Sequence, residues 1–196
     1  EIIIRITAKA VDATAATVML DEGEAALRER LEKYIYGVDD ESLASCLGKE
    51  LLEQHKTISF AESCTGGLAS SLVTDIAGSS EYLIGSIVTY TNEAKHNLLK
   101  VNEVTLQNYG AVSEETALEM AQGVRKLFGS DYGVGITGNA GPGGSEGKPV
   151  GLVYIAIATP DKVYCKEFNF TSTRVENKLR IALTAISMVI DKLKEN

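Results

Sequence analysis

Hydrophobic positions along the chain change repeatedly between the period of a strand and the period of a helix. Short apolar runs predict strands, and stretches with an apolar residue every three or four positions predict helices between them. The predicted strands cover residues 57–60, 84–90, 132–137, 150–159 and 163–170, and the predicted helices cover residues 40–55, 68–77, 92–99, 114–128 and 174–193. Strands separated by helices predict an α/β fold in which helices cover both faces of a largely parallel sheet.

The last two predicted strands are joined only by residues 160–162. A link of three residues is too short for a crossover connection, so these strands must form an antiparallel hairpin. The sheet is therefore predicted to be mixed and mostly parallel.

The first 38 residues predict a separate small β-α-β unit, with strands at residues 2–8 and 34–36 around a helix at residues 13–31. Turn-forming residues cluster at 37–40 and mark its end. We therefore expect two domains, residues 1–38 and 39–196. The chain starts at Glu1 without a methionine, so we also expect it to be a piece of a longer polypeptide.

Composition and charge exclude several classes of protein. The chain is 44% hydrophobic and 23% charged, which is ordinary for a globular protein. A net charge of −8 argues against a broad basic face, so we expect no direct contact with nucleic acid. No apolar run is long enough to span a bilayer and no signal-peptide pattern is present, so we expect a cytoplasmic protein without membrane contact. No spacing of carboxylates or histidines predicts a metal site.

Ser63 is the first candidate catalytic residue, because it lies in the segment A-E-S-C-T-G-G at residues 61–67, between a predicted strand and a predicted helix. A hydroxyl in such a turn is placed where amide donors can stabilise a developing oxyanion. A serine nucleophile also needs a base to remove its proton. The plainer alternative is that Ser63 only caps the helix that follows.

Lys95 is the candidate base, because it lies at the next strand-to-helix turn, in Y-T-N-E-A-K at residues 90–95. Thr91 is a plausible N-cap, which places Lys95 near the start of its helix, where the helix dipole disfavours the charged ammonium. Burial would lower its pKa further. Tyr90 could orient the pair or relay a proton. The alternatives are a solvated surface lysine and an ordinary strand tyrosine.

Cys64 is a rival nucleophile, since a thiolate attacks better than a hydroxyl and a helix N-terminus lowers the pKa of a thiol. Cysteine catalysis usually needs a histidine, however, and His55 and His96 are poorly placed for that role. We favour a packing role for Cys64. The three cysteines form no C-x-x-C pair, which suits a reducing compartment.

Two glycine patterns resemble nucleotide-binding motifs but fail in detail. Gly133, Gly135 and Gly138 match G-x-G-x-x-G inside a predicted strand instead of in the turn after one. Gly147-Lys148 resembles the end of a phosphate-binding loop, but Pro149 replaces the required hydroxyl. The glycine-rich loop at residues 138–147 is either a mobile connection or a segment that wraps a phosphate with its amides.

With these residues in place, the chain from about Asp40 onward resembles the CinA C-terminal domain family. The matching segments include those around Ser63 and Lys95, together with D-I-A-G-S-S at 75–80, G-A-V-S-E at 110–114, T-G-N-A-G-P at 137–142 and K-P-V-G at 148–151. The leading unit resembles the linker that follows an N-terminal nucleotide-pyrophosphatase domain in longer CinA proteins. One departure is the run F-T-S-T-R at 170–174, where the family commonly shows F-x-G-D-R.

The resemblance implies a three-layer α/β/α sandwich and a nicotinamide mononucleotide deamidase that uses a Ser/Lys mechanism without a cofactor. It implies that Ser63, Lys95 and Tyr90 are catalytic and that a further set of residues binds the nucleotide. The substrate-binding residues that we expect are Glu62, Thr65, Gly66, Gly67, Asn92, Thr137, Gly138, Ala140, Gly141, Pro142 and Arg174. We also expect a homo-oligomer. The competing hypothesis is a non-catalytic, competence-associated module that binds nucleotides or proteins.

Overall fold

The computed structural model describes residues 2–195, and the chain divides into two compact units between Glu41 and Ser42. In the first unit, helix α1 covers Ala13–Leu31 and a 3-10 turn, η1, covers Glu32–Tyr34. Asp12 caps α1 by accepting a hydrogen bond from the amide of Ala15 at 2.8 Å. The helix therefore matches its predicted bounds.

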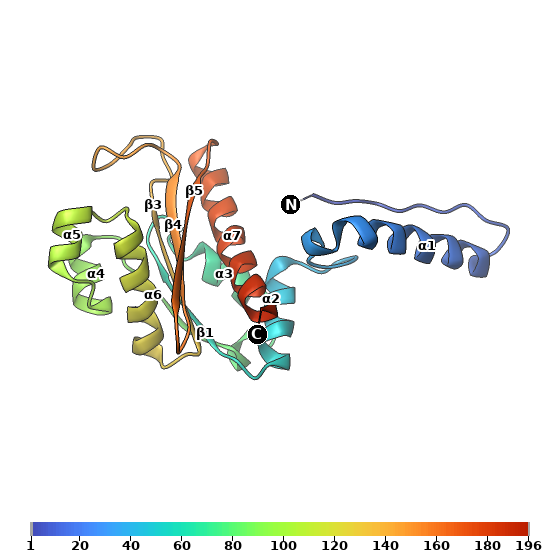
Figure 1. The fold of residues 1–196 in the computed structure, drawn as a ribbon, viewed down its shortest axis with the longest axis horizontal. Coiled ribbons are helices and arrows are strands. Elements are labelled where there is room, and N and C mark those ends of the chain that lie inside the picture. Colours follow the sequence, from blue (N-terminus) through green and yellow to red (C-terminus); the bar gives the residue numbers. More distant parts are fainter. Residues whose placement is uncertain (1, 196) are drawn as a thin grey trace. The chain divides into compact units, whose positions relative to one another are not determined.

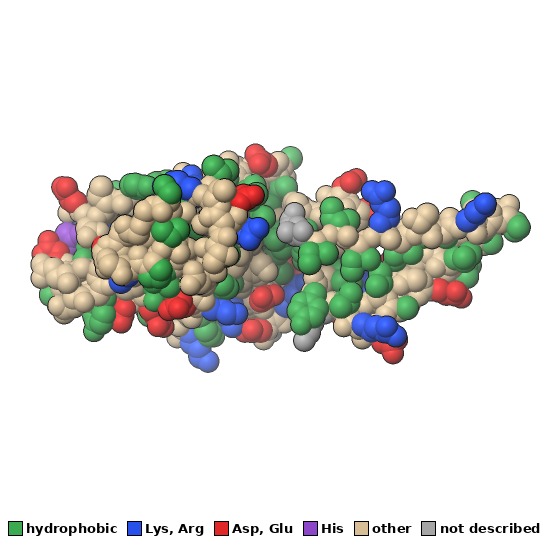
Figure 2. All heavy atoms as spheres, turned by 90° about the horizontal axis from the view of Figure 1, so that it is seen from above, with side chains coloured by type: hydrophobic (Ala, Val, Ile, Leu, Met, Phe, Trp, Pro, Cys, Tyr) green, Lys and Arg blue, Asp and Glu red, His purple; other side chains and the backbone are tan. Residues whose placement is uncertain are grey.

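The two strands predicted for the first unit are wrong. Residues 2–8 run as an extended chain without a strand partner among the described residues (Figure 1). Of the second predicted strand, residues 34–36, Tyr34 ends η1 and residues 35–36 have no regular structure. A strand needs a neighbour to satisfy its amides and carbonyls, which an apolar pattern alone does not supply. Many apolar side chains of this unit remain exposed (Figure 2), including Ile2, Ile3, Val11, Val18 and Met19.

The second unit is built on one five-stranded sheet with the order β2-β1-β3-β4-β5. Strand β1 pairs in parallel with β2 and β3, whereas β4 is antiparallel to both β3 and β5. The sheet is therefore mixed, and β4 and β5 form the predicted hairpin. The strand bounds are β1 Ile58–Glu62, β2 Leu83–Val88, β3 Tyr132–Gly138, β4 Leu152–Ala158 and β5 Val163–Asn169.

Helices cover both faces of this sheet, which confirms the three-layer α/β/α architecture (Figure 1). One face carries α4 (Asn92–Leu99), α5 (Glu103–Tyr109) and α6 (Glu114–Phe128). The other carries α2 (Leu43–Glu53), α3 (Leu68–Thr74) and α7 (Arg174–Lys194), and a short 3-10 turn, η2 (Ser79–Glu81), precedes β2. Helix α5 had no counterpart among the predicted elements.

Two glycines of β3 allow α6 to pack closely against the sheet. A Cβ added at Gly133 would lie 2.3 Å from the carbonyl oxygen of Ala121, and one added at Gly135 would lie 2.4 Å from that of Ala117. Side chains at these positions would push the helix away from the strand. Helix packing therefore explains the first two glycines of the G-x-G-x-x-G pattern.

The sheet topology brings the carboxyl ends of β1, β2 and β3 to the same end of the sheet, which we call the carboxyl edge. The amide of Ser63, directly after β1, donates to the carbonyl of Ile136 in β3 at 2.9 Å. On the other side, the amide of Thr89, directly after β2, donates to the carbonyl of Glu62 at 2.9 Å. In parallel sheets this edge is the usual position of a ligand site.

Candidate active site

The amine nitrogen of Lys95 lies 3.2 Å from the hydroxyl oxygen of Ser63, within hydrogen-bonding distance. Both side chains are buried. Ser63 directly follows β1, and Lys95 lies in α4, the helix that follows the neighbouring strand β2. Thr91 caps α4 as predicted, by accepting a hydrogen bond from the amide of Ala94. The two turns therefore bring the hydroxyl and the amine together.

Burial changes the chemistry of the Lys95 amine. Only 1% of the residue is exposed, and this desolvation lowers the pKa of the amine from 10.5 to about 8, while nearby Cys64 and Glu146 oppose the shift. At neutral pH the neutral fraction therefore rises about three-hundredfold, since each pKa unit is a factor of ten. The amine also donates to the carbonyl oxygen of Thr89 at 2.9 Å, which fixes its position beside Ser63.

Ser63 does not cap the following helix, so the plainer interpretation of this serine is wrong. The N-cap of α3 is Gly67, which has φ 94°, a value that favours glycine. Gly66, with φ 65°, donates its amide to the carbonyl of Ser63 at 3.1 Å and closes the turn. The Ser63 hydroxyl is left facing Lys95.

The turn leaves two amides without an acceptor among the described residues. The Gly66 amide is bonded to the Ser63 carbonyl and the Gly67 amide to the Glu62 carboxylate, whereas the amides of Cys64 and Thr65 have no acceptor in another described residue. Two adjacent N–H groups next to a hydroxyl can stabilise an oxyanion formed when that hydroxyl attacks a carbonyl carbon. The prediction that amides of this turn stabilise an oxyanion therefore now concerns only the amides of Cys64 and Thr65.

Glu62, predicted to bind substrate, has a different role in the structure. Its buried carboxylate accepts hydrogen bonds from the amides of Gly67, Ala69 and Ser70 and from the Ser70 hydroxyl, at 2.8–3.1 Å. A carboxylate at a helix N-terminus satisfies amides that would otherwise lack partners. Because four donors of the turn and of the start of α3 already bind its carboxylate, Glu62 stabilises the turn instead of facing a ligand.

Cys64 is buried, and its surroundings do not favour a thiolate. Burial raises the pKa of the thiol from 9.0 to about 12, although the charges of Lys95 and Arg174 act in the opposite direction. The thiol is therefore protonated at neutral pH and a weak nucleophile. This agrees with the packing role that we expected.

Tyr90 lies beside the site but makes no hydrogen bond with Ser63 or Lys95 in the described part of the chain. The residue is 59% exposed, and its hydroxyl accepts a hydrogen bond from Arg174 at 2.9 Å. Arg174 also donates to the carbonyl oxygen of Gly141. The predicted residues Tyr90, Gly141 and Arg174 thus come together at the rim, where the arginine joins two loops.

Polar groups at the end of β3 and directly after it form hydrogen bonds within the protein. The Thr137 hydroxyl donates to the carbonyl of Ala111 at 2.6 Å, and the carbonyl of Ala140 accepts from the side-chain amide of Asn177 at 3.2 Å. Gly138 packs against Val153, since an added Cβ would lie 2.6 Å from a methyl carbon of that residue. Pro142 is exposed. The Thr137 hydroxyl is thus already occupied by the protein itself.

Glu146 in the glycine-rich loop and Lys148 directly after it bind the end of α5 and the turn before α6, which the sequence did not indicate. The Glu146 carboxylate accepts from the amides of Ala111 and Val112 at 3.0 and 3.3 Å. The Lys148 amine donates to the carbonyls of Tyr109 and Val112, each at 2.5 Å. Lys148 therefore serves as a tether, and the loop is held by specific bonds.

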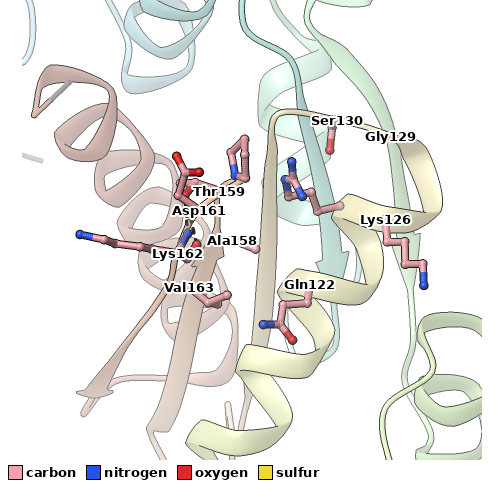
Figure 3. Close-up of a pocket in the computed structure, with 11 residues that line it drawn as sticks. Gln122, Lys126, Gly129, Ser130, Ala158, Thr159, Asp161, Lys162 and Val163 are labelled. Carbon is pink, nitrogen blue, oxygen red and sulfur yellow. Dashed lines mark hydrogen bonds between the residues drawn. The ribbon is translucent and has the colours of Figure 1, made fainter.

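Asn92, predicted to bind substrate, lies away from the dyad. It is exposed and lines a surface cavity of about 650 Å³ between α4 and α5 that includes neither Ser63 nor Lys95. A second cavity, of about 500 Å³, lies at the opposite end of the sheet between α6 and the β4–β5 hairpin (Figure 3). Its polar lining includes Gln122, Arg125, Lys126, Thr159, Asp161 and Lys162. The Asn92 assignment is not supported by this geometry.

Two buried hydroxyls near the dyad lack hydrogen-bond partners in the described part of the chain, which the sequence did not predict. The hydroxyls of Thr65 and Thr89 are buried and have no hydrogen-bond partner among residues 2–195. Thr65 follows the nucleophile candidate by two residues, and Thr89 supplies the carbonyl that accepts from Lys95. Unpaired buried hydroxyls are uncommon, and at this edge they mark unused hydrogen-bonding capacity beside Ser63.

Comparison with known families places this geometry in context. The profile of the CinA C-terminal domain matches residues 40–193, and that of the damage-inducible protein CinA KH domain matches residues 1–37. The chain belongs to the CinA family. Similar curated proteins include a CinA-like protein of Endomicrobium trichonymphae, 50% identical over 93% of this chain, and a putative competence-damage inducible protein of Bacillus pumilus, 43% identical over 100%. The chain spans 42% and 47% of the lengths of these two relatives.

Solved structures of CinA proteins share the fold. The competence/damage inducible protein CihA from Agrobacterium tumefaciens is 40% identical and superposes with a TM-score of 0.75, covering 82% of this chain and 98% of that one. A CinA superfamily protein from Klebsiella pneumoniae is 30% identical with a TM-score of 0.77, covering 79% and 97%. No helix among residues 2–195 is long and apolar enough to cross a membrane.

Proposed function

We propose that this chain is a Ser/Lys amidohydrolase that converts nicotinamide mononucleotide to nicotinic acid mononucleotide and ammonia. The observation that carries the proposal is the buried amine of Lys95, with a pKa of about 8, held 3.2 Å from the Ser63 hydroxyl. A lysine can remove a serine proton only when it is neutral, and burial supplies that condition. The choice of substrate comes from the resemblance to active CinA-type deamidases.

In the first half of the proposed reaction, Lys95 takes the proton of Ser63 while the serine oxygen attacks the carboxamide carbon. The carbonyl oxygen becomes an oxyanion facing the amides of Cys64 and Thr65. Lys95 then gives its proton to the amide nitrogen, the carbon–nitrogen bond breaks, and ammonia leaves an acyl-serine ester. The carbonyl of Thr89 keeps the amine in place throughout, since it accepts one of its N–H groups.

In the second half, water attacks the ester carbon. Lys95 takes a proton from that water, the same two amides stabilise the second oxyanion, and the bond to Ser63 breaks. The serine oxygen recovers the proton from Lys95, and the carboxylic acid product leaves. Each proton that Lys95 accepts is passed on in the same half-reaction, so the dyad returns to its starting state.

The test is ammonia release from nicotinamide mononucleotide by the purified chain and by two neighbouring variants. Ser63→Ala should abolish release, whereas Cys64→Ala, which changes the adjacent buried residue, should retain most of it. Activity that survives Ser63→Ala but not Cys64→Ala would assign the nucleophile to the thiol. Tight binding of the mononucleotide without ammonia release by the unaltered chain would instead support the competing binding module.

A further inference from the structure

Lys178 is a cation beside the proposed site that the reaction above does not use. It lies on α7, four residues and about one turn after Arg174, so both side chains leave the same side of the helix. A Cβ added at Gly66 would meet only one atom within 4 Å outside its own neighbourhood, the Lys178 amine nitrogen, at 3.6 Å. The ammonium group therefore lies directly over the turn that carries Ser63.

No group among residues 2–195 neutralises this ammonium. Among the residues that the structure describes, Lys178 has neither a hydrogen-bond acceptor nor a carboxylate within 4.0 Å, although acidic residues outnumber basic ones by 27 to 19. The carboxylates on this side are engaged elsewhere: Glu62 with the α3 amides, and Glu176 with the hydroxyls of Ser172 and Thr173. Like charges four residues apart on a helix repel, so Lys178 and Arg174 together favour an anion.

Arg174 is less free than Lys178 to bind that anion. Its guanidinium already donates to the Gly141 carbonyl and the Tyr90 hydroxyl. Lys178 carries three donors on a flexible stem, and an ammonium binds phosphate well as a point charge. The only anionic group of nicotinamide mononucleotide that reaches beyond the reacting carboxamide is its phosphate.

We propose that Lys178 binds the phosphate of the substrate and so selects nucleotides over nucleosides. This inference rests on the proposed function for the identity of the substrate. The turn at Gly66 is the near wall of this subsite: with no side chain there, a phosphate can reach the ammonium over the backbone. Glycine is then favoured at position 66 for two reasons. Its φ of 65° suits glycine, and any side chain there would fill the space next to the Lys178 amine.

The test compares a phosphorylated ligand with the same ligand lacking phosphate. In a Ser63→Ala background, which prevents turnover, calorimetry measures the Kd of nicotinamide mononucleotide and of nicotinamide riboside. Lys178→Gln should raise the Kd of the mononucleotide at least tenfold and leave that of the riboside within about twofold. Lys178→Arg, which keeps a cation, should restore most of the preference.

Lys126→Gln is the matched control, since it removes the same charge from an exposed position on α6 at the distant cavity (Figure 3). It should change neither Kd. The inference is overturned if Lys178→Gln keeps the preference for the mononucleotide, or if it weakens both ligands equally, which would indicate damage to the turn.

This experiment separates the two proposals. Phosphate-dependent binding that requires Lys178, in a chain that releases no ammonia, would overturn the proposed reaction and keep the subsite. Ammonia release by a Lys178→Gln variant with an unchanged KM for the mononucleotide would overturn the subsite and keep the reaction.

Discussion

The hydroxyl of Tyr90 accepts a hydrogen bond of 2.9 Å from the guanidinium of Arg174, 84 positions away in the chain. The same guanidinium donates to the carbonyl of Gly141. One side chain at the start of α7 thus joins the segment after β2 to the glycine-rich loop after β3. Tyr90 is thus bound to Arg174 and makes no hydrogen bond with Ser63 or Lys95 in the described part of the chain.

Arg174→Gln should therefore affect activity more than Tyr90→Phe. The phenylalanine removes one hydrogen bond to a charged group, which we expect to lower kcat/KM by roughly tenfold or less. Glutamine cannot donate to both the Gly141 carbonyl and the Tyr90 hydroxyl as the guanidinium does, so this variant should lower kcat/KM by about 10- to 100-fold. Steady-state ammonia release measures both. A Tyr90→Phe variant as inactive as Ser63→Ala would instead place the phenol in proton transfer, as the sequence first suggested.

The pH dependence of the reaction should report the Lys95 amine. Its neutral form is the active one, so kcat/KM should rise with pH through about 8 and then level off, instead of rising through the ordinary lysine value of 10.5. Lys95→Met should lower kcat by about 10²- to 10⁴-fold, the usual contribution of a general base. Cys64→Ala should keep the same rising limb. If the limb moves with Cys64→Ala, the titrating group is the thiol.

The same lowered pKa predicts a pH-dependent cost to stability. The unfolded chain binds a proton at Lys95 up to pH 10.5, whereas the folded chain releases it near pH 8, so the contribution of Lys95 to stability rises with pH between these values. At pH 7 burial of this lysine lowers the free energy of unfolding by about 3 kcal/mol relative to burial of a neutral amine, because each pKa unit corresponds to about 1.4 kcal/mol.

Lys95→Met should remove this dependence. Relative to the unaltered chain, the free energy of unfolding of the variant should fall by about 2–3 kcal/mol between pH 7 and pH 10. Urea denaturation of both proteins at each pH measures the difference, and effects of other titrating groups largely cancel between them. A difference that stays constant over this range would show that the amine is not desolvated in the folded chain.

Glu62→Gln should destabilise the turn that presents Ser63. The change removes the charge from an acceptor of four hydrogen bonds and introduces an amide N–H among donors, which should lower the free energy of unfolding by about 2–3 kcal/mol. Glu53→Gln, at an exposed position of α2, should change it by less than about 0.5 kcal/mol. Equal effects of the two substitutions would contradict the assigned role of Glu62.

The sequence predicted the centre of the site because two simple rules coincide there. Ser63 and Lys95 each follow a strand and begin a helical segment, and parallel neighbours end at the same edge of a sheet. Sequence order alone did not state that β1 and β2 are neighbours, but consecutive strands usually are. The bounds of α1, α4 and α6 also followed from the pattern, because clear caps mark their starts.

The wall of the site was less predictable, since its contacts join distant parts of the chain. Nothing in the local sequence shows that Arg174 reaches Tyr90 or that Glu146 accepts the amides of Ala111 and Val112. Glu62 was expected to bind substrate from the family resemblance alone, whereas its carboxylate accepts hydrogen bonds from the start of α3. Its helix-capping role depends on the turn at Gly66 and Gly67 folding back over the carboxylate.

The dyad also lies across the outermost pairing of the sheet. Lys95 is placed by the segment that follows β2, and β2 is an edge strand with β1 as its only neighbour in the described sheet. The last rung between them is the bond from the Thr89 amide to the Glu62 carbonyl. Edge strands separate more readily than central ones. If the ends of β1 and β2 separated on heating, the Lys95 amine would move away from the Ser63 hydroxyl while the rest of the sheet stayed folded. Activity would then be lost at a lower temperature than the one at which the protein unfolds.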